Sequence, residues 1–226
     1  MPTFTWLGHG ASALHVGDKH LLVDPFLTGN PAAAAKPEDV QADFILLSHG
    51  HGDHLGDTVA IAKRTGATVI TNFEIASWLG GQGVTAHGQH LGGGHDFSCG
   101  YIKLTLALHG SGLPDGTYGG NPCGFLITTT DGKKLYLACD TGLFGDMSLI
   151  GDEGLDLAVL PIGDNYTMGP ADALRAAKLL RAKVVVPVHY NTWELIAQDA
   201  AAWAAQVETE TSSKVKVLKP GESFDP

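Results

Sequence analysis

One short segment of the chain concentrates side chains that bind metal ions. Between His49 and Asp57 the sequence HGHGDHLGD holds three imidazoles and two carboxylates. Nitrogen and oxygen ligands of this kind suit Zn, Mn or Fe. A structural zinc site more often uses thiolates and a closed coordination shell, so this cluster predicts a catalytic metal site. Glycines at positions 50, 52 and 56 remove side-chain bulk and let the backbone turn sharply.

Three more candidate ligands each follow an apolar run that predicts a buried strand. They are His109, Asp140 and His189. Because strand ends on one rim of a sheet gather at a common site, we expect these side chains to join the first cluster. Seven nitrogen and oxygen ligands suit two metal ions and leave room for solvent. The full set is His49, His51, Asp53, His54, His109, Asp140 and His189.

Other polar residues at predicted strand ends are candidates for supporting roles. His9, which lies between two glycines after an apolar run, is either a buried structural histidine or a donor or proton shuttle that faces the site. Asp24 either orients a ligand histidine through a hydrogen bond or caps a turn. Four residues that follow later strands are candidates for the wall of a substrate pocket: Asn165, Tyr166, Tyr190 and Asn191.

The elements that must position these residues alternate along the chain. Apolar and alternating runs predict strands at residues 3–7, 11–16, 20–23, 44–47, 68–70, 101–108, 125–130, 134–139, 156–160, 183–188 and 215–218. Helical patterns cover residues 58–64, 73–79, 170–180 and 193–207. A glycine-rich segment with His87, His90 and His95 predicts a loop over residues 87–96. The pattern favours a mixed β-sandwich flanked by helices, and no linker divides residues 1–226 into separate domains.

Composition narrows the classes of partner. The chain has 14 Lys and Arg against 24 Asp and Glu, a formal charge of −10, and no basic stripe, so nucleic-acid binding is not expected. Three cysteines without paired spacing fit a reducing compartment. With no signal peptide and no apolar run of about 20 residues, we expect a cytoplasmic protein without a membrane span. The Ala-rich stretch from Pro31 to Lys36 is either a contact in a homo-oligomer or a plain loop.

The motifs together resemble one known family. The segment His49–His54 looks like the HxHxDH signature of the metallo-β-lactamase superfamily, and His109, Asp140 and His189 follow in the order that this superfamily uses. Further segments are similar to uncharacterised metal-dependent hydrolases related to the ascorbate-phosphate lactonases: Trp6–His9, Val23–Pro25, Leu108–Gly112, Gly120–Gly124, Asp140–Met147 and Pro187–Thr192. Cys139 departs from the pattern, because relatives commonly carry glycine before the aspartate, and we expect its side chain to pack away from Asp140.

The resemblance implies a fold and a division of the ligands. The fold would be an α/β (α+β) four-layer αββα sandwich, with two mixed sheets flanked by helices. One divalent metal ion would be held by His49, His51 and His109, and the second by Asp53, His54 and His189. Asp140 would bridge the two ions. Zinc is the first expectation, with manganese or iron as alternatives.

Such a site predicts a metal-dependent hydrolase acting on a small-molecule substrate. A hydroxide shared by the two ions would cleave a small ester, lactone or phosphoester, and Asp53 would orient it. The general acid would be His9 or a metal-bound water. Two other classes stay open: a di-iron redox or oxygen-handling protein with the same ligands, and a non-catalytic metal-binding module.

Overall fold

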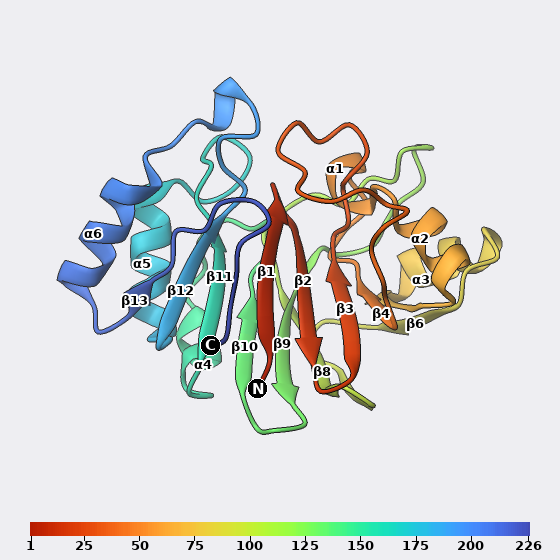
Figure 1. The fold of residues 1–226 in the computed structure, drawn as a ribbon, viewed down its shortest axis with the longest axis horizontal. Coiled ribbons are helices and arrows are strands. Elements are labelled where there is room, and N and C mark those ends of the chain that lie inside the picture. The colour runs from red at the N-terminus through yellow and green to blue at the C-terminus, as the bar shows by residue number, and fades with distance from the viewer.

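Two β-sheets of seven strands each form the centre of the protein in a computed structural model that describes residues 1–226 (Figure 1). The first sheet contains, in spatial order, β14 (Ser223–Phe224), β1 (Thr3–Gly8), β2 (Ala11–Val16), β3 (Lys19–Val23), β4 (Phe44–Leu46), β5 (Thr68–Asn72) and β6 (Ala86–Gln89). The second contains β13 (Lys214–Val215), β12 (Val184–Val188), β11 (Leu157–Pro161), β10 (Lys134–Leu137), β9 (Cys123–Thr129), β8 (Gly100–Leu106) and β7 (Gly94–Phe97). Each sheet combines antiparallel and parallel pairs, so the predicted mixed sheets are confirmed.

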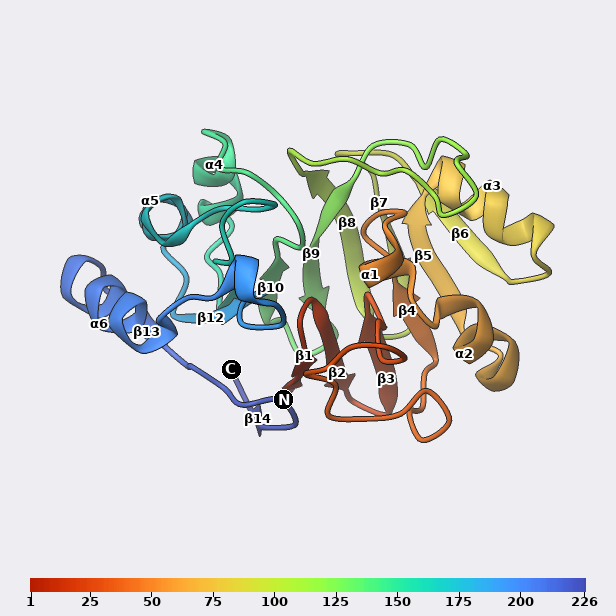
Figure 2. The ribbon, with the colours of Figure 1, turned by 90° about the horizontal axis from the view of Figure 1, so that it is seen from above.

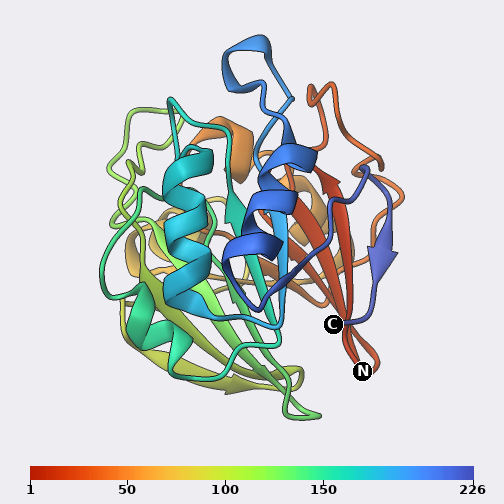
Figure 3. The ribbon, with the colours of Figure 1, turned by 90° about the vertical axis from the view of Figure 1, so that its left-hand side faces the viewer.

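Helices cover the outer faces of the two sheets (Figure 2). The helices are α1 (Gly52–Leu55), α2 (Thr58–Thr65), α3 (Phe73–Gly81), α4 (Met147–Gly151), α5 (Pro170–Leu180) and α6 (Ala200–Glu210), with a 3-10 turn at Glu194–Ile196. Helices α2 and α3 pack on the first sheet, and α5 packs on β11 of the second sheet beside α6 (Figure 3). This confirms the expected αββα layers. No helix is both long enough and apolar enough to cross a membrane.

Alternating side chains of the first sheet supply two hydrophobic cores. On β4, Leu46 packs between the sheets and Ile45 packs under the helices, and on β5 Ile70 and Val69 divide in the same way. This alternation follows from the two-residue period of a strand. Because both faces of β4 are buried, its sequence is a continuous apolar run, whereas in β5 only the central Val69 and Ile70 are apolar.

The chain crosses from the first sheet to the second where we expected a loop. Residues 86–89 form β6, which pairs with β5, and residues 94–97 form β7, which pairs with β8. The rings of His87 and His95 stack across this crossing with centroids 4.5 Å apart. The prediction of a loop over residues 87–96 is therefore wrong, because tertiary pairing makes strands from a sequence of low strand propensity.

The C-terminal region also differs from the prediction. Instead of one helix over residues 193–207, the 3-10 turn at Glu194–Ile196 is followed by a separate helix, α6, that begins at Ala200 with Asp199 as its N-cap. The predicted strand at 215–218 shortens to β13, and the last strand, β14, pairs with β1. The sequence does not predict β14, because a two-residue strand carries no periodic signal.

One carboxylate joins three strands of the second sheet. Asp156, just before β11, accepts a hydrogen bond from the backbone N–H of Lys134 at 3.0 Å. It also pairs with the Nζ atoms of Lys133 and Lys183 at 3.2 and 2.8 Å. Burial raises the pKa of Asp156, but the bonds from Lys183, Lys134 and Lys133 outweigh it and hold that pKa below its ordinary value. The ionised carboxylate thus stabilises the native state at pH values above the carboxyl range and loses this effect as the pH falls through its folded pKa.

We predict that Asp156→Asn lowers the free energy of unfolding at pH 7 by about 1–2 kcal/mol, because a charged hydrogen-bond acceptor is lost. The difference from the wild type should shrink in acid, where the wild-type carboxylate is protonated. Thermal unfolding at pH 7 and at a series of pH values from about 4 down to about 2, the range in which a carboxyl with a lowered pKa takes up its proton, measures both effects. The control is Asp172→Asn, which removes an exposed i,i+3 pair with Arg175 and should change little. Equal losses in the two variants would contradict the prediction.

Candidate metal centre

All seven candidate ligands lie at one edge of the sandwich, beyond the ends of strands from both sheets. His49 and His51 follow β4, and the short helix α1 then carries Asp53 and His54. This one-turn helix was not predicted from the sequence. His109, Asp140 and His189 follow β8, β10 and β12. The structure thus brings together every candidate ligand that the sequence indicated.

Three imidazoles converge through nitrogen atoms. Nδ1 of His51 lies 3.1 Å from Nε2 of His49 and 3.2 Å from Nε2 of His109. Three imidazole nitrogens bound to one tetrahedral zinc at about 2.0–2.1 Å lie roughly 3.3 Å apart, so this spacing fits a shared ion. The ligand atoms of these three histidines lie close enough together to hold a single ion, and no further residue belongs to the group. The three histidines therefore match one of the two expected sites.

A second group contains Asp53, His54 and His189, with His9 beside them. Nε2 of His54 and both ring nitrogens of His189 are buried and make no well-aligned hydrogen bond, although Oδ2 of Asp140 lies within 3.2 Å of both Nε2 atoms. Leaving buried polar atoms unpaired is costly unless another partner satisfies them. A divalent cation satisfies such nitrogens, so this group also fits a metal ion.

Asp140 lies between the two groups. Its Oδ2 atom is 3.2 Å from Nε2 of His54, 3.1 Å from Nε2 of His189 and 3.5 Å from Nε2 of His109. Burial raises the pKa of this carboxyl, but His189 and His54 outweigh burial and hold it well below its usual range. Asp140 is therefore an ionised acceptor that reaches both sets of histidines.

A buried network behind the ligands fixes the orientation of two histidines. Asp24 accepts hydrogen bonds from the backbone N–H of Ser48 at 2.7 Å and from its hydroxyl at 2.6 Å. Because that hydroxyl donates to Asp24, it accepts from Nδ1 of His49 at 2.8 Å. Nδ1 of His54 also lies 2.8 Å from Asp24. These bonds turn the Nε2 atoms of both histidines toward the two groups, a geometry that fits the first of the two roles considered for Asp24, the orientation of ligand histidines.

Two neighbouring carboxylates change the pKa of His54. Burial lowers its pKa, but Asp140 and Asp24 outweigh burial and raise that pKa well above the ordinary value for histidine. A divalent cation competes with the proton for Nε2 of His54, because a histidine ligand must be deprotonated. Metal binding at this group is therefore expected to release a proton.

His9 is fully buried behind Asp53. Burial lowers the pKa of His9 to about 4, against the raising effect of the hydrogen bond to Asp53, so the ring is neutral at pH 7. Its Nε2 lies 3.2 Å from Oδ2 of Asp53 and its Nδ1 lies 2.8 Å from Oγ1 of Thr192. Since the carboxylate can only accept, Nε2 carries the proton and Nδ1 accepts from the threonine hydroxyl. Of the expected roles, this geometry fits a donor that acts through Asp53.

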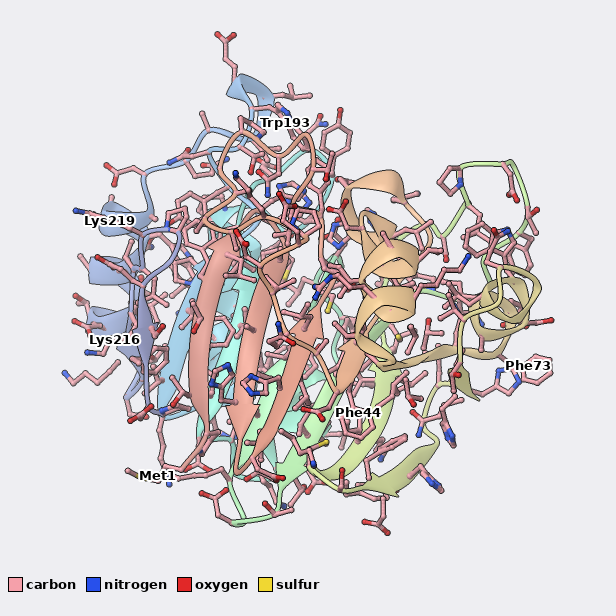
Figure 4. The ribbon with its side chains drawn as sticks, turned by 45° about the vertical axis from the view of Figure 1, so that its right-hand side comes forward. Met1, Phe44, Phe73, Trp193, Lys216 and Lys219 are labelled. Atoms are coloured by element: carbon pink, nitrogen blue, oxygen red, sulfur yellow. The ribbon has the colours of Figure 1, made fainter.

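A pocket of about 450 Å³ opens onto the ligands. It is lined by His51, Asp53, His109, Asp140, Tyr166 and Trp193. The sequence predicts Tyr166 in the pocket wall. It predicts Trp193 as the first residue of a helix and gives no sign that Trp193 lines the pocket. Figure 4 places Trp193 at the upper end of the molecule, beyond the ends of β1 to β3.

The other three residues expected in the pocket wall lie elsewhere. Tyr190 stacks on Trp6 with ring centroids 5.4 Å apart, and together with Asn191 it lines a separate groove beside the C-terminal segment. Asn165 is exposed, and its backbone N–H bonds the side chain of Asp164. A residue that comes shortly after a strand therefore does not necessarily place its side chain in the metal pocket.

Left-handed backbone marks four strand ends around the site. His9, Asp24, Cys139 and His189 have φ angles of 56°, 42°, 53° and 56°. Such conformations cost energy in residues other than glycine and cluster at functional sites. Cys139 lies beyond β10 in this conformation, which glycine adopts without strain, so the glycine that the resemblance leads us to expect would suit the position. The predicted strand over residues 134–139 ends at Leu137, but the side chain of Cys139 packs against the hydrophobic core.

Comparisons with known proteins bear on this arrangement. The family model described as the β-lactamase superfamily domain matches residues 19–190. A UPF0173 metal-dependent hydrolase of Pelotomaculum thermopropionicum is 55% identical over 226 residues, which cover 98% of each chain. The chain belongs to the metallo-β-lactamase superfamily.

Solved structures agree with this metallo-β-lactamase assignment. Igni18, described as a novel metallo hydrolase from Ignicoccus hospitalis, is 37% identical and superposes with a TM-score of 0.91 over 99% of this chain and 98% of its own. The metallo-β-lactamase fold protein YhfI from Bacillus subtilis is 17% identical with a TM-score of 0.75 over 99% and 98% of the two chains, which shows the shared fold. The comparisons confirm the expected family, fold and class of enzyme, a metal-dependent hydrolase.

We predict that Asp24→Asn weakens zinc binding by roughly 10–100-fold, because two ligand histidines lose the group that orients them. Competition with a chromophoric chelator measures the affinity. The control is Asp43→Asn, a carboxylate that likewise accepts a backbone N–H, that of His20, but lies at the other end of the strands. Wild-type zinc affinity in a folded Asp24→Asn protein would show that the network does not support the ligands.

Proposed function

We propose that this metallo-β-lactamase relative is a hydrolase that uses two divalent cations to cleave a small carbonyl ester or lactone. The observation that carries the proposal is the position of Asp140, whose Oδ2 lies within 3.5 Å of histidines from both ligand groups. His49, His51 and His109 would hold one ion, and Asp53, His54 and His189 the other. Zinc suits these ligands, and manganese or iron would also fit them.

The residues of the chain divide the work at such a centre. When bound, two cations supply Lewis-acid polarisation of the substrate and acidify water. Asp53 lines the pocket and receives the N–H of His9 on Oδ2, so the neighbouring oxygen is left to orient the attacking water. His9 positions Asp53, whose carboxylate fixes the tautomer of His9, and the hydroxyl of Thr192 holds the ring by donating to its Nδ1. Trp193 and Tyr166 form the apolar part of the pocket wall.

The electrostatics of the pocket favour an uncharged reacting group. None of its six lining residues is Lys or Arg, the side chains that most often bind phosphate and carboxylate groups. The chain as a whole also carries a formal charge of −10. A carbonyl ester or lactone is therefore favoured over a phosphoester. A panel of one lactone, one phosphodiester and one thioester tests this choice, and turnover of the phosphodiester alone would contradict it.

We predict two equivalents of transition metal per chain in protein purified without chelator or added metal. Asp140→Ala should hold no more than one equivalent and lose activity by more than about two orders of magnitude, beyond the roughly 10–100-fold effect typical of a supporting residue. Elemental analysis and turnover of the active panel substrate measure the two effects. The control is Asp172→Ala on the surface of α5, which should match the wild type in both.

Removal of the metal distinguishes a hydrolase from the two other classes considered, a di-iron redox protein and a non-catalytic metal-binding module. A chelator should abolish turnover, and zinc or manganese should restore it. Tight metal binding without turnover of any substrate would favour the non-catalytic module. An iron-loaded protein with visible absorption would favour the di-iron reading. Full activity in Asp140→Ala would remove the bridging assignment.

A further inference from the structure

His109 borders two hollows, not one. On one side it lines the metal pocket with Asp53 and Asp140. On the other it lines a groove of about 460 Å³ with Leu91, Leu106 and Leu108, in which no residue is charged. The two spaces therefore meet at a metal-ligand histidine.

The groove continues away from the metal centre. Leu91 and Leu106 also line a further hollow of about 410 Å³, where β8 faces the short helix α4. Phe144, Leu149 and Ile150 form the opposite wall of that hollow. The apolar track thus runs from His109 along β8 to α4. It ends at Lys103, Asp146 and Glu153, which carry charges of both signs.

The apolar side chains along this track are unusually exposed. Leu106, Leu108 and Leu149 are 37%, 51% and 64% exposed. Single exposed leucines need no explanation, but a contiguous exposed apolar surface marks a binding site. Since it starts at the metal pocket, the occupant that explains its position is part of the substrate.

We propose that the groove from His109 to Leu149 binds the linear alkyl or acyl chain of an uncharged substrate whose ester or lactone carbonyl lies at the metal pocket. This inference rests on the proposed function. It is supported by the shared lining at His109, the absence of charge in the near half of the groove, and the absence of Lys and Arg from the pocket. Burial of a methylene is worth about 0.8 kcal/mol, which corresponds to roughly a fourfold gain in affinity.

The test uses alkyl hydroxamates, which chelate zinc through one end and present a chain of chosen length at the other. We measure binding of acetohydroxamate and octanohydroxamate to the zinc-loaded protein by calorimetry. Affinity should rise about twofold to fourfold per methylene until the groove is filled. Leu106→Glu and Leu149→Glu should each collapse the ratio of the two affinities at least tenfold. Val217→Glu, at a 41% exposed residue of the separate groove beside Trp6, should keep the ratio.

A second probe separates this inference from the proposed function. The neutral fluorophore N-phenyl-1-naphthylamine should bind the chelator-treated protein and lose affinity in Leu106→Glu but not in Val217→Glu. If the fluorophore binds in this way and no hydroxamate binds, the groove stands and the proposed metal centre fails. If hydroxamates bind without dependence on chain length, or the variants keep the ratio, the groove proposal is overturned.

A second copy of the chain is the rival occupant of the same surface. Light scattering on the wild type and on Leu149→Glu distinguishes it. We expect the same molecular mass for both proteins. A wild-type dimer that becomes a monomer in Leu149→Glu would assign the surface to self-association and overturn the proposal.

Discussion

Asp140 carries a negative charge although it is almost completely buried, and the surrounding architecture is organised around it. An isolated buried carboxylate is strongly disfavoured, so it persists only where positive charge or hydrogen-bond donors surround it. Here His54 and His189, which come from the two sheets, lie within 3.2 Å of the same oxygen. The contact therefore depends on how the sheets are stacked, and a divalent ion would strengthen that link between them.

Backbone conformation at the strand ends makes this convergence possible. A strand that continued straight would carry its next side chain past the site, whereas a left-handed residue turns the chain within one position. His9, Asp24, Cys139 and His189 all adopt this conformation. Each costs of order 1–3 kcal/mol, and the buried sheets on either side supply the stability that holds them in place. The packing of the core and the geometry of the centre are therefore coupled.

The sequence predicts the candidate ligands better than the surrounding pocket, for a physical reason. Asp140 and His189 each follow a strand buried on both faces, and His109 follows a longer strand with a buried face, so an apolar run locates all three without tertiary information. Helix α5 is equally clear, because Pro170 and an amphipathic pattern define it. Trp193 has no such signal: its backbone is extended, and the extended backbone of Ala197 ends the 3-10 turn before α6 begins, which breaks the predicted helix. Strands β6 and β7 likewise exist through pairing with neighbours and not through propensity.

Strand β14 has a consequence for solubility. It pairs with β1 through Phe4 opposite Phe224, so the last residues of the described chain cover the first strand of the sheet. Without this cover, β1 would present unpaired backbone N–H and C=O groups along an edge that other chains can join. The two ends of the chain lie close together in Figure 1, so a change at either end acts on the same edge. Protection against edge-to-edge aggregation thus depends on a pairing made across the whole length of the chain.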